Sequence, residues 1–210
     1  MPVATLYDVH GNLRALEAVL AEIPDGATIV GGGDVVAGGE QPSETLEALR
    51  ALGERVVWIR GNADRELHPD EEGLAPPEFL DVARAALTDE QIEFLHDLPP
   101  KAQIDNVLYV HASPRNDLDI FTELTPEERI AFLFTDVDAD VVVCGHTHMQ
   151  FDRTIAGKRV VNSGSVGMPY EEKPGAYWTL DLEHRRTPYE GATLQASRED
   201  ALAEFTDRGL

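Results

Sequence analysis

Three short apolar runs in the first 60 residues, each followed by polar residues or glycines, constrain the fold of this chain most strongly. The runs cover residues 3–7, 28–30 and 55–59, and two stretches with leucines at helical spacing separate them. Apolar runs that alternate with helices are typical of βαβ units, in which consecutive strands lie parallel. The sequence therefore predicts an α/β fold whose parallel strands end at one edge of a sheet.

The rest of the chain continues the alternation without a linker that would divide it. Further strands are expected at residues 107–110 and 140–144, and short strands joined by turns are expected from 151 to 190. We therefore expect one domain over residues 1–210, a length that can bury a large core.

Capping residues indicate where several helices begin. Ser43 is expected to cap the second helix, and Thr88 and Gln91 form a capping box that opens another. Pro126 is expected at the first position of a later helix, and a final helix is expected over residues 198–206.

Five of the expected strands end in residue types that bind metal ions. These residues are Asp8, His10, Asp34, Asn62, His111, His146 and His148. Ligands of open α/β sheets bind beyond the carboxyl ends of the strands. Glycines beside most of these residues allow sharp turns that would direct the side chains toward a common centre. The pattern predicts a metal site at this edge. Its oxygen and imidazole ligands, without a thiolate, suit Mn²⁺, Fe, Zn²⁺, Ni²⁺ or Co²⁺.

These residues carry a resemblance to a known family. Asp8-x-His10, Gly33-Asp34, Gly61-Asn62, His111 and Gly145-His146-Thr147-His148 resemble the motifs of the calcineurin-like metallophosphoesterases. The similarity extends over about residues 1–180 and is strongest to the small single-domain phosphodiesterases of bacteria and archaea. It implies a four-layer αββα sandwich, in which helices flank two mixed β-sheets, and a centre with two divalent metal ions.

The resemblance also implies how the ligands are divided. One metal would be bound by Asp8, His10, His148 and a bridging Asp34. The other would be bound by Asp34, Asn62, His111 and His146. Manganese is the first choice for both positions. The implied activity is hydrolysis of a phosphoester, most simply a phosphodiester, by a hydroxide that bridges the two metals.

The chain departs from the family pattern directly after Asn62. Many members have a histidine there that protonates the leaving group, whereas this chain has Ala63. Asp64 and His68 are the nearby candidates for a general acid, and the alternative is that water or the metals suffice. Ala63 also leaves open a different class of function, in which the fold is a scaffold that binds a partner protein without catalysis.

Two further residues could contact the substrate phosphate. Asn12 could do so or could cap the first helix, and Arg115 could pair with phosphate oxygens or lie in solvent. Because the chain is short and has no obvious cap insertion, we expect an exposed site that accepts small diesters.

Charge and composition limit the partners. The chain has 39 acidic and 17 basic residues, a net charge of -22, which disfavours nonspecific binding to nucleic acids and to anionic membranes. A small phosphoester substrate remains compatible, because bound divalent metals reverse the local field. The first residues do not resemble a signal peptide and Cys144 is the only cysteine, so a cytoplasmic location is expected. The oligomeric state stays open.

Overall fold

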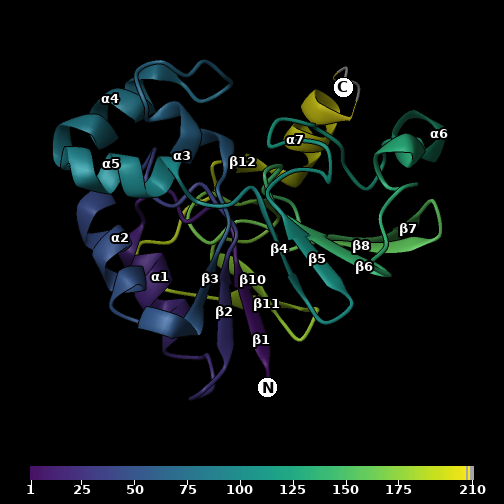
Figure 1. Cartoon of the computed structure of the whole chain (residues 1–210), viewed down its shortest axis with the longest axis horizontal. Helices are drawn as coiled ribbons and strands as arrows, with labels where there is room; N and C mark the ends of the chain where they lie inside the picture. Colours follow the sequence, from purple (N-terminus) through teal and green to yellow (C-terminus); the bar gives the residue numbers. More distant parts are fainter. Residues whose placement is uncertain (207, 209–210) are drawn as a thin grey trace.

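Two five-stranded mixed sheets face each other in the computed structural model, which describes residues 1–206 and 208 (Figure 1). The first sheet has the order β11-β10-β1-β2-β3, in which β1, β2 and β3 run parallel. Its strands are β1 (Val3–Leu6), β2 (Thr28–Gly31), β3 (Val56–Trp58), β10 (Ala176–Leu180) and β11 (Glu183–Thr187). The predicted parallel strands are therefore confirmed.

The second sheet has the order β4-β5-β6-β8-β7, in which β5, β6 and β8 run parallel. Its strands are β4 (Lys101–Ile104), β5 (Val107–Val110), β6 (Val141–Cys144), β7 (Phe151–Ile155) and β8 (Lys158–Asn162). A core that includes Tyr7, Val30, Tyr109 and Val143 lies between the two sheets.

Helices flank both sheets, which completes the expected four layers. On the side of the first sheet lie α1 (Leu13–Leu20), α2 (Pro42–Arg50), 3₁₀ helix η1 (Gly53–Arg55), α3 (Asn62–Glu66), α4 (Pro77–Ala86) and α5 (Asp89–His96). On the side of the second, the described residues form α6 (Glu127–Ile130) and 3₁₀ helix η2 (Ala131–Leu133). Ile130 and Leu133 nevertheless bury the outer face of this sheet together with Phe134.

Helix boundaries agree with the sequence prediction in part. Thr88 and Gln91 form the expected capping box, with Gln91 N 3.2 Å from Thr88 Oγ1 and Thr88 N 2.9 Å from Gln91 Oε1. The prediction that Ser43 caps α2 is wrong, because the helix already begins at Pro42, whose fixed φ suits a first helical position. Pro126 precedes α6 instead of opening it.

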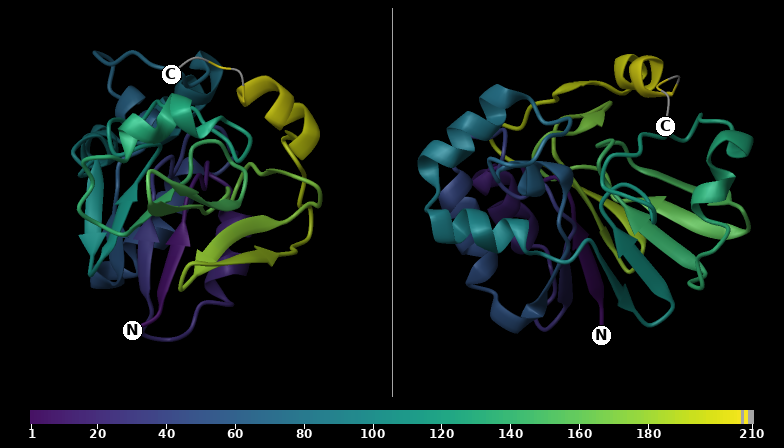
Figure 2. Two further views of the ribbon diagram at one scale, coloured as in Figure 1. Left: turned by 90° about the vertical axis from the view of Figure 1, so that its right-hand side faces the viewer. Right: turned by 45° about the horizontal axis from the view of Figure 1, so that its top comes forward.

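The C-terminal segment returns to the edge where the parallel strands end. Strand β12 (Ala196–Ser197) pairs with β9 (Tyr170–Glu171), and α7 (Arg198–Phe205) follows directly. Figure 2 shows α7 above the ends of both sheets. Within the part of the chain that the structure describes, no helix combines the length and the apolar character needed to span a bilayer.

Candidate metal centre

The loops that follow five parallel strands bring all seven predicted metal ligands together. Asp8 and His10 follow β1, Asp34 follows β2, Asn62 begins α3 after β3, His111 follows β5, and His146 and His148 follow β6. The described groups of acidic residues and histidines that could hold a cation are Asp8 with His10 and His148, and Asp34 with His111 and His146. This division matches the two sets of ligands that the sequence predicts, with Asn62 beside the second.

The backbone at most of these ligands adopts a left-handed conformation that residues other than glycine rarely adopt. Five of the seven have positive φ angles. The values are +55° for Asp8, +50° for His10, +53° for Asp34, +64° for His146 and +57° for His148. Such left-handed residues are uncommon and cluster at functional sites, where the surrounding structure holds them in place.

Two glycines allow the strand ends to approach each other closely. A Cβ atom on Gly61 would lie 2.2 Å from Oδ1 of Asp34, and a Cβ atom on Gly145 would lie 2.5 Å from Oδ2 of Asp8. Both distances are far below van der Waals contact. The glycines are therefore required to hold the two carboxylates at the centre.

In each of the two aspartates, one carboxylate oxygen accepts a hydrogen bond from a backbone N–H group and the other points toward the histidines. Asp34 Oδ1 accepts a hydrogen bond of 2.8 Å from Ala63 N, and Asp8 Oδ2 accepts one of 2.8 Å from His146 N. Asp34 Oδ2 lies 3.5 Å from His111 Nε2 and 4.0 Å from His10 Nε2. This oxygen thus faces both groups of ligands. Asp8 Oδ1 also does so, at 3.5 Å from His148 Nε2 and 3.9 Å from His111 Nε2, so the distances are compatible with a bridging Asp34 without singling it out.

Backbone carbonyls fix the orientation of three imidazoles. The Nδ1 atoms of His10, His111 and His148 donate to Ala37 O, Gly32 O and Met168 O, at 2.5, 2.9 and 2.7 Å. With Nδ1 protonated, a neutral ring presents the lone pair of Nε2 to the centre. His10 Nε2 and His148 Nε2 are 3.0 Å apart, so a positive charge between these lone pairs is needed to offset their repulsion.

Unpartnered polar atoms provide a test of whether this arrangement fits a metal. Asp8 Oδ1, Asn62 Oδ1, His111 Nε2 and His146 Nε2 are buried and have no hydrogen-bond partner. Buried polar atoms without partners are costly, and a native protein rarely leaves several of them in one place. Because all four are lone-pair donors from different strand ends, the residues present fit bound cations.

Charge at the centre also favours a cation. Burial would lower the pKa of His111, but the Asp34 and Asp8 carboxylates outweigh this effect and raise it to about 10. Burial would raise the pKa of Asp34, but the neighbouring His111 and His10 hold it below its usual range. Burial and the charge of His111 lower the pKa of His146 to about 4. The site accordingly stabilises positive charge near the two carboxylates.

Neither candidate for the general acid lies where it could reach a substrate. Asp64 is fully buried, and its carboxylate accepts hydrogen bonds from the backbone N–H groups of Asp34, Val35 and Gly61 at 2.8–2.9 Å. It therefore positions the loop that carries Asp34 and does not line the cavity at the metal centre. Burial and the charge of Asp34 raise its pKa to about 6.

His68 points away from the centre as well. Its ring packs against His96 at a centroid distance of 4.8 Å, and its Nε2 lies 3.7 Å from Glu93 Oε1. It is also absent from the cavity lining. Neither of the two sequence candidates therefore lies where it could replace the missing histidine, whereas Glu204 does line the cavity.

The two predicted phosphate contacts have structural roles instead. Asn12 caps α1, because its Oδ1 accepts from Ala15 N at 3.1 Å, and its Nδ2 donates to Gly167 O and Tyr189 Oη. Arg115 pairs with Asp119, four residues further along the chain, outside the cavity at the metal centre.

Glu66 is a residue of the site that sequence reasoning missed. Its side chain is 1% exposed, and Oε1 accepts from Asn62 Nδ2 at 3.0 Å, which turns Asn62 Oδ1 toward the centre. Glu66 also accepts from Leu74 N and Ala75 N, which lie in the cavity wall. The spacing of four residues on one helix was the only signal in the sequence that could have paired Glu66 with Asn62.

We expect Glu66→Gln to lower the metal affinity of the position that includes Asn62 by about 10–100-fold, the usual cost of losing a hydrogen bond that orients a metal ligand. Glutamine has one acceptor oxygen, so it cannot serve both Asn62 and Ala75. Metal titrations that resolve the two positions would measure the effect. Glu71→Gln, a change of the same kind at a neighbouring exposed carboxylate that pairs with Arg65, should leave both affinities unchanged. Equal weakening of both positions in Glu66→Gln would contradict this role.

Single histidine variants should separate the two metal positions. His111→Ala and His146→Ala should each lower occupancy beside Asn62, whereas His10→Ala and His148→Ala should lower it at the other position. Loss of a direct ligand should cost at least about tenfold in affinity, since even outer contacts cost that much. Anomalous scattering at the metal edge gives the occupancies, with His96→Ala as the control. Depletion of the opposite position by any variant would show that the division is mistaken.

Comparisons with known proteins were made for the whole chain. Residues 1–185 match the family model described as the calcineurin-like phosphoesterase superfamily domain. An uncharacterised protein of Methanocaldococcus jannaschii is 26% identical over 188 residues, which cover 81% of this chain and 72% of that protein. A symmetrical bis(5'-nucleosyl)-tetraphosphatase of Janthinobacterium is 35% identical over 119 residues, 53% of this chain and 43% of that enzyme. The alignment thus spans less than half the length of the tetraphosphatase.

Among solved structures, a metallophosphoesterase from Sphaerobacter thermophilus superimposes with a TM-score of 0.77 at 24% identity. The match covers 90% of this chain and 89% of that one. A protein from Pyrococcus horikoshii gives a TM-score of 0.76 at the same identity and coverage. These likenesses show the fold.

Proposed function

Because the chain belongs to the calcineurin-like phosphoesterase superfamily, we propose that it is a metal-dependent phosphodiesterase with two divalent metal ions. The observation that carries the proposal is the position of Asp34 Oδ2, which lies 3.5 Å from His111 Nε2 and 4.0 Å from His10 Nε2, beside four buried polar atoms that have no partner. Asp8, His10 and His148 would hold one cation, and Asn62, His111 and His146 the other, with Asp34 bridging them. Mn²⁺ is our first choice, and Fe, Zn²⁺, Ni²⁺ or Co²⁺ would suit the same donors.

Cations bound there would lower the pKa of water toward neutrality and neutralise the phosphoryl oxygens as charge develops. Backbone and side-chain groups of this chain hold the ligands in the required orientation. Gly32, Ala37 and Met168 carbonyls hold three imidazoles in the tautomer that binds metal. Asp64 holds the turns of Asp34 and Gly61 in place through their N–H groups.

Water is the proposed nucleophile, because the candidate side chains nearby are committed or buried. Cys144 is fully buried on β6, and burial followed by the charge of Asp8 raises the pKa of its thiol. Thr147 lines the cavity, but its hydroxyl accepts a hydrogen bond from Asn162 Nδ2 at 3.0 Å. In the part of the chain that the structure describes, neither group donates a hydrogen bond to a histidine or a carboxylate, the contact that activates a nucleophile.

Charge in the cavity supports a diester over more highly charged substrates. Among the described residues that line it, Arg208 is the only arginine or lysine, and it pairs with Glu204. A dianionic monoester or a polyphosphate chain would need further cationic partners. A phosphodiester carries one negative charge, which the metal centre can balance.

The test combines metal analysis with an assay of bis(p-nitrophenyl) phosphate. Protein purified without chelator should contain up to two transition-metal ions per chain. Chelation should abolish hydrolysis, and Mn²⁺ should restore it. Protein that binds no metal and remains inactive with every candidate ion would overturn the proposal and favour the scaffold alternative.

A further inference from the structure

The cavity at the metal centre has an apolar wall that the metal chemistry does not use. It encloses about 260 Å³, with His10, Asp34, Asn62, His146 and His148 on its lining. The rest of the lining is largely apolar and includes Pro76, Phe79, Ile120, Met168, Tyr170 and Phe205. An apolar surface of this extent beside a charged centre indicates a ligand with a polar end and an apolar end. The sequence prediction of an exposed site did not include this wall.

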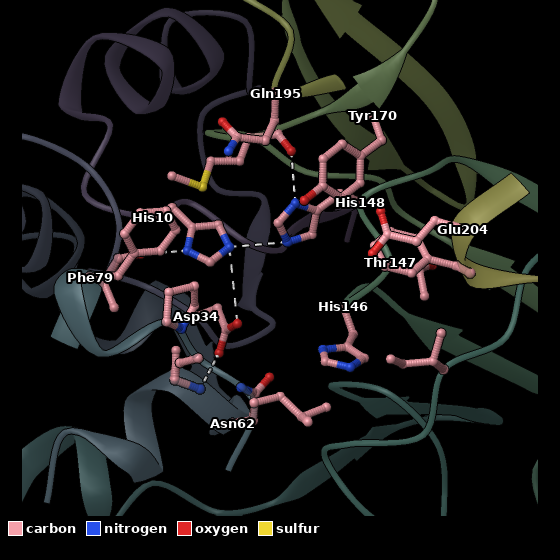
Figure 3. Close-up of a pocket in the computed structure, with 18 of the residues that line it drawn as sticks. His10, Asp34, Asn62, Phe79, His146, Thr147, His148, Tyr170, Gln195 and Glu204 are labelled. Carbon is pink, nitrogen blue, oxygen red and sulfur yellow. Dashed lines mark hydrogen bonds and ion pairs between the residues drawn. The ribbon is translucent and has the colours of Figure 1, made fainter. Parts of the chain in front are cut away.

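Aromatic rings form a continuous surface from the metal ligands outward. The Tyr170 ring stacks on the His148 ring at a centroid distance of 5.0 Å and an interplanar angle of 21°. The ring centroids of Phe205 and Tyr170 are 5.6 Å apart, and Cζ of the Arg208 guanidinium lies 4.9 Å from the centroid of the Phe205 ring. Figure 3 shows Tyr170 flat beside His148, with Glu204 reaching in from α7. A planar substituent on a phosphate bound at the centre would thus extend from the metal site onto these aromatic rings.

Specific contacts fix α7, and with it Phe205, over the cavity. Arg198 donates to Glu171 Oε2 and to Gln150 O, both at 2.7 Å, and lies 3.2 Å from Glu123 Oε1. Farther along, the Thr206 hydroxyl lies 2.8 Å from the Thr122 hydroxyl. Gln195, Glu204 and Phe205, which contribute to the wall, lie beyond residues 1–185, the part of the chain that matches the family model.

We propose that Phe205 and Tyr170 select a phosphodiester with a planar aromatic substituent, and that this ring packs against them while the phosphate lies at the metal centre. The proposal rests on the proposed function for the position of the phosphate. Stacking on aromatic side chains adds to the gain from burying apolar area. A small alkyl substituent would leave the wall in contact with water and would bind more weakly.

Two phosphonate monoesters of equal charge test the preference by binding alone, because methoxide is a poor leaving group and their P–C bond does not hydrolyse. Methyl phenylphosphonate and methyl methylphosphonate differ only in a phenyl or a methyl group on phosphorus. By calorimetry on the Mn²⁺-loaded protein, we expect the phenyl compound to bind about tenfold more tightly. Phe205→Ala should reduce that ratio at least about threefold without weakening binding of the methyl compound. Phe205→Leu, which keeps an apolar side chain, should fall between.

Leu202→Ala is the matched control, because Leu202 lies on α7 but lines a different surface groove. It should keep the native ratio, which separates the loss of the ring from damage to the helix. Equal affinities for the two anions in the native protein, or an unchanged ratio in Phe205→Ala, would overturn the proposal. Hydrolysis of bis(p-nitrophenyl) phosphate tests the proposed function separately, so an aromatic preference without hydrolysis would refute only the latter.

Discussion

Asp34→Asn should lower phosphodiester hydrolysis by at least about 10²–10³-fold, the scale of losing one major electrostatic element of a catalytic site. The variant replaces Oδ2, which faces both groups of ligands, with an amide nitrogen that cannot bind a metal. Asparagine tolerates the φ of +53°, and its oxygen can still accept from Ala63 N. The loss should therefore be chemical, with the fold retained. Measurements of kcat/KM and of bound metal would follow it.

Asp181→Asn is a matched control for this substitution. Asp181 also has a left-handed backbone, with a φ of +51°, and its Oδ1 accepts from Val3 N at 2.9 Å, away from the centre. It should keep native activity and metal content. Near-normal turnover and two bound metals in Asp34→Asn would reject the bridging role.

We expect the rate of hydrolysis to depend steeply on the leaving group, because neither Asp64 nor His68 lies where it could protonate that group. A general acid contributes about 10²–10⁴-fold, and poor leaving groups need it most. For substituted phenyl phosphodiesters, kcat/KM should fall steeply as the pKa of the phenol rises. Asp64→Asn and His68→Ala should leave this slope unchanged, since neither residue lines the cavity.

Ala63→His places an imidazole where the structure has a methyl group on the cavity lining. It should flatten the slope and raise the rate for the poorest leaving groups by about 10²-fold, the lower end of general acid catalysis. Ala63→Gln, of similar size but without a transferable proton, should not. A flat slope in the native protein would contradict this account, and its steepening in Glu204→Gln would identify Glu204 at the rim as the acid.

The positions of the ligands could be predicted because each follows an apolar run of a parallel strand. Periodicity locates the end of such a strand, and the topology then places Asp8, Asp34 and His111 at one edge. The direction of a side chain on a short turn has no such signal. From the sequence, Asp64 is one candidate for the general acid. In the structure, its position on α3 directs its carboxylate to the backbone N–H groups of Asp34 and Val35.

The apolar wall could not be predicted for a different reason. Tyr170 and Phe205 belong to segments far apart in the sequence, which are held together by the pairing of β9 with β12 and the ion pair of Arg198 with Glu171. A two-residue strand and a short final helix have no pattern of apolar residues that would indicate that they pack together. The sequence prediction of an exposed site considered only large insertions as a cover and did not include this wall.

The left-handed backbone at five of the ligands has a consequence for how the sequence can change over time. Each such residue costs on the order of 1–2 kcal/mol relative to a relaxed conformation. Five of them amount to a sizeable share of the roughly 5–15 kcal/mol by which a domain is stable. Glycine at the same positions would relieve that cost. Ala156 and Leu182 adopt the same conformation away from the centre, so the conformation by itself does not mark a ligand. The five at the centre differ in that each places a carboxylate or an imidazole within reach of a cation, a group that glycine would not supply.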